Sequence, residues 1–105
     1  MEKEVQMVVQ FENWTLYEIT NLETNITILD FKNSDEDDGF SIINTQDIEN
    51  GGFKNNKCLI KELTLILNSY SYYTDELDEF IKKLTIAKNF MRIVEKYAKE
   101  NGFML

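Results

Sequence analysis

The residues best suited to chemistry stand together in one run, Asn33-Ser34-Asp35-Glu36-Asp37-Asp38-Gly39, which holds four carboxylates in a row. A helix-loop-helix calcium site needs oxygen ligands at loop positions one, three and five, glycine at position six and glutamate at position twelve. With Gly39 at position six, Ser34 falls at position one and Thr45 at position twelve, so the site lacks its terminal carboxylate. We therefore expect no metal here but a solvated acidic connection, with a recognition loop as the alternative.

Catalysis is disfavoured by what the 105 residues lack. There is no histidine, which removes His-assisted nucleophiles, the usual zinc ligand sets and the commonest general base near neutral pH. Cys58 is the one cysteine, and we expect it to be a small buried apolar residue. Neither the P-loop motif nor the glycine-rich dinucleotide-binding motif occurs. The sequence thus predicts a protein that is not an enzyme and binds no cofactor.

The acidic residues are unevenly distributed along the chain. Residues 1–56 hold twelve acidic residues against three lysines, a net charge of -9, whereas residues 57–105 hold seven against eight basic residues, a net charge of +1. A strongly negative surface repels nucleic acid backbones and anionic membranes. We expect neither as a direct partner, and expect instead a protein with a basic surface, such as a groove that normally holds nucleic acid.

The element that must position everything else is a helix over residues 74–101. Thr74 is the expected N-cap, and Gly102 supplies a left-handed stop after which Phe103 folds back on the last turn. Acidic residues fill the first turns and lysines the last, which suits the helix dipole. The apolar residues of the main face follow a spacing of three and four: Leu77, Phe80, Leu84, Ala87, Met91, Val94 and Ala98.

A second apolar stripe lies beside the first on this helix: Ile86, Phe90, Ile93 and Tyr97. Together the two stripes are wider than the face that a helix lying on one sheet needs. The helix should therefore be covered from two sides. We expect the second cover to come from the same chain, through the preceding helix or the C-terminal tail, with self-association as a homodimer as the alternative.

The N-terminal half reads as strands. Alternating residues predict strands over 4–11, 14–20 and 25–32, which form an antiparallel meander, and a short fourth strand over 40–44. One helical turn is expected over 45–50, and Gly51-Gly52 should mark the change from sheet to helices. Residues 57–68 favour a shorter helix by composition, although Leu63, Leu65 and Leu67 alternate as in a strand.

The prediction is therefore one α+β domain over residues 1–105, with an acidic β half over 1–52 and a helical half over 53–105. Its N-terminal antiparallel meander of three to four strands packs against a long C-terminal helix that follows a shorter one. A tyrosine and serine cluster over 69–73 separates the helices, either packing their corner or forming a recognition surface. No run of about 18 apolar residues and no signal-peptide layout occurs, so we expect a cytoplasmic protein.

Elimination leaves binding to another protein as the leading hypothesis: an inhibitor or regulator whose carboxylates occupy a basic, nucleic-acid-binding surface of its partner. The abundance of Asn, Lys and Ile is typical of AT-rich coding, which suggests a phage-encoded, anti-CRISPR-like protein acting in a bacterial or infected host cell. The alternatives are an immunity protein or antitoxin and a homo-oligomeric scaffold. The expected contact residues are Asp35, Glu36, Asp37, Asp38, Asp47 and Glu49 for charge, and Trp14, Tyr70, Tyr72 and Tyr73 as aromatic anchors; self-association would use Ile86, Phe90, Ile93 and Tyr97.

Overall fold

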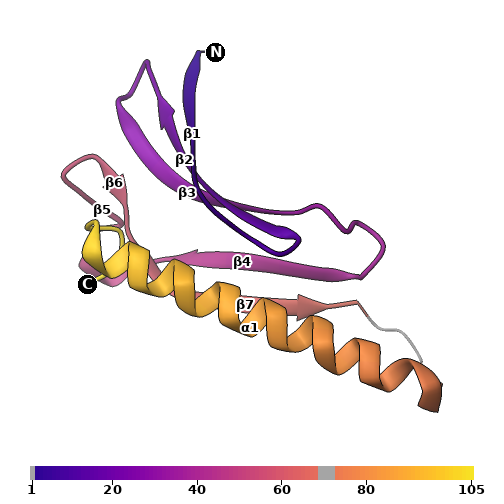
Figure 1. Ribbon diagram of the computed structural model, residues 1–105. Coiled ribbons are helices and arrows are strands. Elements are labelled where there is room, and N and C mark those ends of the chain that lie inside the picture. Colours follow the sequence, from indigo (N-terminus) through magenta and orange to yellow (C-terminus); the bar gives the residue numbers. More distant parts are fainter. Residues whose placement is uncertain (1, 69–72) are drawn as a thin grey trace.

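Strands come first along the chain and one long helix follows, which confirms the predicted α+β class (Figure 1). The computed structural model describes residues 2–68 and 73–105. Within these residues no helix is long and apolar enough to cross a membrane. In chain order the elements are β1 (Lys3–Phe11), β2 (Trp14–Asn21), β3 (Ile26–Asn33), β4 (Phe40–Gln46), the 3-10 turn η1 (Ile48–Asn50), β5 (Phe53–Lys54), β6 (Lys57–Cys58), β7 (Ile60–Leu67), the 3-10 turn η2 (Thr74–Glu76) and α1 (Leu77–Glu100).

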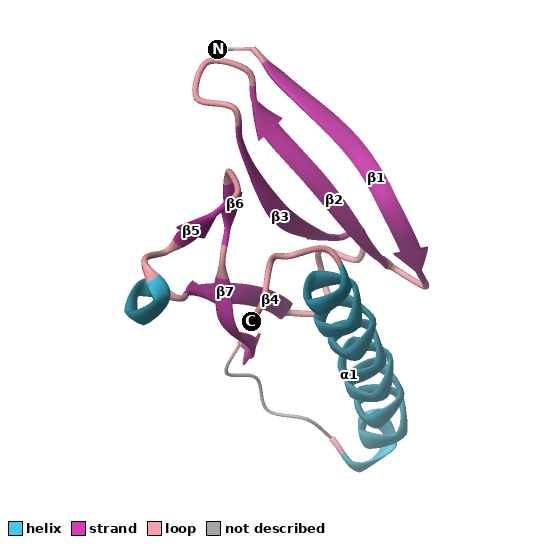
Figure 2. Cartoon of the chain, turned by 90° about the vertical axis from the view of Figure 1, so that its left-hand side faces the viewer, coloured by secondary structure: helices cyan, strands magenta, loops and turns pink. Residues whose placement is uncertain are grey.

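β1, β2 and β3 form the predicted antiparallel meander, which β6 and β5 extend into a sheet of order β1-β2-β3-β6-β5 (Figure 2). Side chains alternate between the two faces of each strand. This alternation places Trp14, Leu16 and Leu29 toward the core, where each is at most 3% exposed. The register of β1 against β2 shifts between Met7 and Val9, so that Val8 forms a β-bulge.

The second sheet contains only β4 and β7, and it corrects the helix expected over residues 57–68. Those residues form β6 and β7 instead, and Ile42 of β4 faces Leu65 of β7 in an antiparallel register. Leu, Lys and Glu favour a helix by intrinsic propensity, but that preference is below about 1 kcal/mol per residue and is readily overridden by tertiary pairing. The alternation of Leu63 and Leu65 was the better signal, because it presents both side chains to the core side of the ladder.

Gly51-Gly52 does not mark the change from sheet to helices, because β5, β6 and β7 all follow it. Both glycines have positive φ, 87° and 78°, and they bend the chain back after η1 so that Leu59 can donate its N–H to the Gly52 carbonyl at 2.9 Å. The expected helical half over 53–105 therefore begins with three strands, and only its last part is helical. β6 and β7 stand where the shorter helix was expected, and the 3-10 turn η2 (Thr74–Glu76) forms the first residues of the expected long helix and leads into α1.

α1 packs against both sheets, with contacts to β2 of the first and β7 of the second, and closes the core (Figures 1 and 2). Ala87, Phe90, Val94 and Ala98 are each 0% exposed, at the spacing of three and four that the sequence shows. The expected end of the helix is confirmed: Gly102 has a φ of 80°, and Phe103 folds back and donates its N–H to the Ala98 carbonyl at 2.8 Å.

The second stripe of α1 is covered from within the chain by the N-terminal sheet and, as expected, by the C-terminal tail, but not by a preceding helix. Phe90 stacks on Trp14 with ring centroids 5.5 Å apart and meets Phe31 edge to face at 6.4 Å. Tyr97 donates a hydrogen bond to the Glu18 carboxylate of β2 and stacks on Phe103. Ile86 and Ile93 are half-buried. Phe90 and Tyr97 are thus already in contact with their own chain, so the stripe as a whole is not a free surface for a second copy.

The Tyr97 hydroxyl predicts a pH dependence of stability. Burial first, and then the hydrogen bond and negative charge of Glu18, raise the pKa of Tyr97 to about 12. In the unfolded chain this pKa is about 10, so the folded state holds the proton more tightly. The resulting stabilisation is present in full below pH of about 10 and is lost as the pH rises through about 12. We expect alkaline unfolding, followed by circular dichroism, to be less steep over this range in Tyr97→Phe.

Ultraviolet titration of tyrosinate provides the control for this assignment. The wild type should contain one late-titrating tyrosine that is absent from Tyr97→Phe, and Glu18→Gln should lower the pKa of Tyr97. A late group that persists in Tyr97→Phe would show that another tyrosine is responsible.

Candidate protein-binding site

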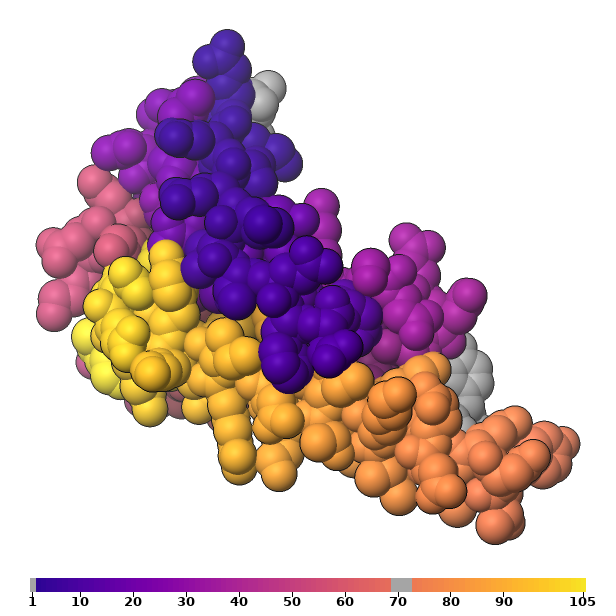
Figure 3. Space-filling view, in the orientation of Figure 1, coloured from indigo at the N-terminus to yellow at the C-terminus, as the bar shows by residue number. Residues whose placement is uncertain are grey.

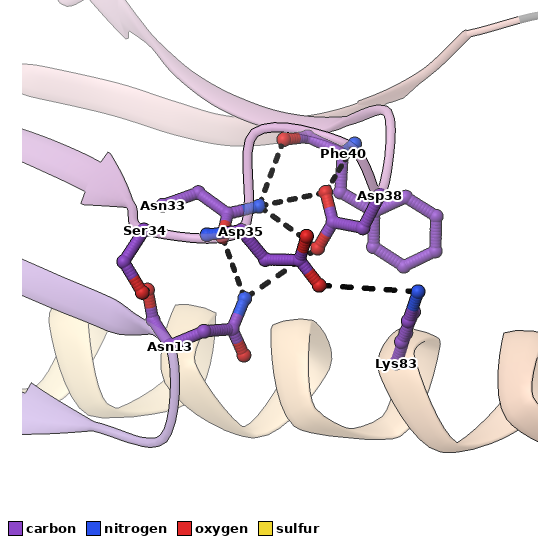
Figure 4. Close-up of polar contacts among 7 residues, drawn as sticks. All are labelled: Asn13, Asn33, Ser34, Asp35, Asp38, Phe40 and Lys83. Carbon is purple, nitrogen blue, oxygen red and sulfur yellow. Dashed lines mark hydrogen bonds and ion pairs between the residues drawn. The ribbon is translucent and has the colours of Figure 1, made fainter.

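Asp38 is an internal structural residue rather than a contact residue (Figure 4). Its side chain is buried, 7% exposed, and accepts hydrogen bonds from Asn33 Nδ2 at 2.8 and 3.0 Å and from the Phe40 N–H at 2.9 Å. Asn13 Nδ2 also lies 3.5 Å from Asp38 Oδ2 and donates to Asn33 Oδ1 at 2.6 Å. Buried carboxylates require such donors. Asp38 therefore holds the β3–β4 loop closed and is removed from the expected contact set.

Asp47 is likewise a structural residue and not the contact residue that we expected. It is 6% exposed, and its Oδ2 accepts a hydrogen bond from Asn50 Nδ2 at 2.8 Å across the η1 turn. Glu49 remains on the surface but forms an ion pair with Lys61 at 3.3 Å, which offsets part of its charge. This pair lies on η1 and β7, away from the β3–β4 loop (Figure 1). The six expected carboxylates therefore do not form one continuous surface.

Asp35, Glu36 and Asp37 are the three loop carboxylates that stay accessible. Glu36 and Asp37 are exposed and Asp35 is half-buried. Asp35 Oδ2 lies 3.9 Å from Lys83 Nζ of α1, and the ring of Phe40, just after the loop, meets Phe80 of the same helix edge to face at 5.7 Å. These two contacts place the loop against the first turns of α1.

The start of α1 adds further carboxylates to this surface. From the sequence we assigned these residues only a favourable interaction with the helix dipole and did not place them at the binding surface. Glu79 precedes Lys83 by four residues on α1, so it shares the helix face that meets Asp35, and Glu76 ends the η2 turn immediately before the helix. Both are exposed. In Figure 3 the loop, in magenta, and the beginning of the helix, in orange, lie at the same end of the molecule. We call Asp35, Glu36, Asp37, Glu76 and Glu79 the acidic end.

A cleft of about 640 Å³ opens beside the acidic end, between the end of β3 and the start of β4. β3 and β4 share no backbone ladder, and side-chain amides bridge them instead: Asn33 Nδ2 donates to the Phe40 carbonyl at 3.2 Å and Asn44 Nδ2 to the Leu29 carbonyl at 3.4 Å. Asp35 and Glu36 line the cleft, together with one cation, Lys32. The two carboxylates suit the end of a lysine or arginine side chain.

The aromatic anchors divide into three cases. Trp14 is 2% exposed and stacked in the core, so it is corrected from a contact residue to a core residue. Tyr73 is 76% exposed immediately before α1, and its N–H is bound to the Glu76 carboxylate at 3.2 Å. Tyr70 and Tyr72 lie outside the described residues. Leu77 and Ile81, four residues apart on α1, are 42% and 57% exposed and add apolar area near Tyr73.

The other chemical groups offer no competing site within the described part of the chain. Burial raises the pKa of the half-buried Cys58 thiol, which lowers its nucleophilicity near neutral pH. In residues 2–68 and 73–105, no group of three or more Cys, Asp or Glu side chains is placed to hold a metal ion. No protein-family model, no curated protein and no solved structure matches this chain. The acidic end must therefore be judged on its own geometry.

Proposed function

We propose that this protein is a protein-binding module that inhibits or regulates its partner by occupying a basic surface with the acidic end. The observation that carries the proposal is the convergence of carboxylates from two segments distant in sequence, with one lysine, Lys83, in ion-pair contact with the loop. Such a surface attracts a basic partner and accelerates its association. A side chain of the partner, lysine or arginine, would enter the adjoining cleft.

Tyr73, Leu77 and Ile81 supply the apolar part of the proposed contact. Charged groups at the rim of an interface contribute mainly to steering, whereas desolvated aromatic and apolar side chains contribute most of the affinity. Among residues 2–68 and 73–105, Tyr73 is the most exposed aromatic residue, and it adjoins Glu76. The proposed interface thus has an apolar centre next to a carboxylate rim.

The nature of the partner follows from the charge. If the basic surface is one that binds nucleic acid, the carboxylates of the acidic end take the place of phosphates and the two ligands compete. A phage-encoded inhibitor of a host or defence enzyme is the biological setting that we favour. An immunity protein that neutralises a toxin would use the same contacts, and assays of the captured partner's activity distinguish the two.

The test compares three chains in a quantitative capture experiment from a bacterial lysate at low salt. The acidic-end variant carries Glu36→Gln, Asp37→Asn and Glu79→Gln. Its matched control carries Glu2→Gln, Glu23→Gln and Glu100→Gln, three exposed carboxylates elsewhere. We expect one partner to be retained by the wild type and the control, and its affinity for the acidic-end variant to fall by about ten- to hundredfold.

The captured partner is then purified and titrated with nucleic acid. Competition between nucleic acid and the wild type, together with weakening of the complex as salt is raised, supports the proposal. Equal binding of the partner by both triple variants overturns it, since removing three charges from the proposed contact would then have no more effect than removing three elsewhere.

A further inference from the structure

We propose that the free edge of β1 pairs in antiparallel register with β1 of a second copy of this chain, which joins two five-stranded sheets into one. β1 is the terminal strand of its sheet and pairs only with β2 among the described residues. Figure 2 shows it as the outermost strand, and in Figure 3 it lies along the surface, in indigo. This inference concerns a different surface from the acidic end and does not depend on the proposed function.

The backbone groups on this edge can be assigned from the hydrogen bonds of the hairpin. Leu22 donates its N–H to the Glu2 carbonyl at 3.2 Å, so residues of β1 in step with Glu2, namely Glu4 and Gln6, bond to β2. The N–H and C=O groups of the alternate residues, Lys3, Val5 and Met7, therefore point away from β2. A strand edge of this kind is a template for another strand.

An apolar row reaches this edge on the outer face of the sheet. Val5 pairs with Ile19, and Ile19 pairs with Ile28, so the three side chains stand side by side across β1, β2 and β3. Val5 is 51% exposed and Ile28 is 40% exposed, and Met7 next to them is 59% exposed. If Val5 faces Val5 of the second copy, the row continues without interruption through six strands. Cross-strand apolar pairs of this kind stabilise sheets.

The charges of β1 and its β-bulge favour this register over the two registers that are shifted by two residues. With Val5 facing Val5, Lys3 faces Met7 of the second copy and Glu4 faces Gln6, a carboxylate against an amide. Sliding by two residues in one direction sets Glu4 against Glu4, which is unfavourable because like charges then face each other. Sliding in the other direction brings in residues beyond the bulge at Val8, where the regular pattern ends. The favoured register makes about six inter-strand backbone hydrogen bonds.

Salt separates this association from binding by the acidic end. Each copy carries a net charge of -8, so two copies repel each other and screening by salt favours the pair. Binding of a basic partner should instead weaken as the salt concentration is raised. A dimer that tightens with salt alongside a partner complex that weakens with salt therefore identifies two independent surfaces.

The experiment is sedimentation equilibrium of the whole chain over a wide concentration range, at low and high salt. The wild type should show a reversible monomer–dimer equilibrium. Val5→Pro removes an N–H that points away from β2, so it blocks pairing with a second copy while every hydrogen bond inside the hairpin is kept. We expect it to weaken the dimer by at least about tenfold. Val5→Thr, which keeps the N–H, is the matched control and should change the dimer much less.

A second pair of variants tests the register even if Val5→Pro does not fold. Gln6→Lys places a lysine opposite Glu4 of the second copy and should tighten the dimer, whereas Gln6→Glu places two carboxylates opposite each other and should weaken it. A wild type that remains monomeric at all accessible concentrations overturns the proposal. So does a dimer whose dissociation constant is the same in Gln6→Lys and Gln6→Glu.

Discussion

Phe90→Ala is expected to lower the free energy of unfolding by about 3–5 kcal/mol. Phe90 is 0% exposed and contacts both Trp14 and Phe31 of the N-terminal sheet. Its removal leaves a cavity beside the rings of Trp14 and Phe31, which both lose their contact with Phe90. Folded proteins are stable by only about 5–15 kcal/mol, so this one substitution should remove a large fraction of the free energy of unfolding.

Urea unfolding measures this effect directly. Trp14 is the single tryptophan and is stacked on Phe90, so its fluorescence reports the core at the position of the substitution. Ile81→Ala, on the same helix but 57% exposed, is the control and should cost less than about 1 kcal/mol. If Phe90→Ala were as stable as Ile81→Ala and only lost self-association, the stripe would be an interface and the packing described above would be wrong.

Asp38→Ala is expected to cost about 2–3 kcal/mol, although the residue lies in the most acidic run of the sequence. The Phe40 N–H would lose its side-chain acceptor, and Asn33 Nδ2 would keep only the Phe40 carbonyl, in a site that is 7% exposed. Leaving a buried donor without a partner costs about 1–3 kcal/mol. The loop that presents Asp35, Glu36 and Asp37 would lose its anchor at the same time.

Asp37→Ala provides the matched control, because it removes the neighbouring carboxylate, which is exposed. Thermal unfolding followed by circular dichroism should show a clear drop in the midpoint for Asp38→Ala and almost none for Asp37→Ala. In the binding assay Asp37→Ala should no longer behave like the wild type, because it weakens the partner complex by removing a charge. Asp38→Ala acts on the complex indirectly, by loosening the loop. Equal stability of the two variants would contradict the structural role given to Asp38.

The meander and the long helix were predictable because their signals are local. Alternation over 14–20 and spacing of three and four over 77–98 each depend on neighbours within one element. The strand β7 was missed because its conformation depends on pairing with β4, about twenty residues away, and composition cannot report that pairing. Cover of the second stripe by the C-terminal tail was expected and is present, because Phe103 stacks on Tyr97. Cover by the N-terminal sheet was missed, since the contact between Trp14 and Phe90 joins opposite halves of the chain.

The candidate site was only partly predictable for the same reason. The run Asp35 to Asp38 looks uniform in the sequence, yet three of its members reach the surface or its edge and Asp38 turns inward to Asn33. A partial signal was present: aspartate next to glycine at the end of a loop often binds backbone N–H groups in its own turn. The contribution of Glu76 and Glu79 depends on where the loop docks, which the Asp35–Lys83 pair reveals and the sequence does not.

The closing of the core by residues late in the chain has a consequence for synthesis on the ribosome. Trp14 and Leu16 present an apolar face early in translation, but Phe90 and Phe103 emerge much later. Phe103 folds back onto the core, and its carbonyl accepts the N–H of Ile60 at 2.7 Å. Contacts so distant in sequence slow folding, because a long loop must close before any of them forms. Until then the meander carries its inner face uncovered, a state in which apolar strands are prone to aggregation. The nascent chain should therefore bind general chaperones until residue 103 has left the exit tunnel.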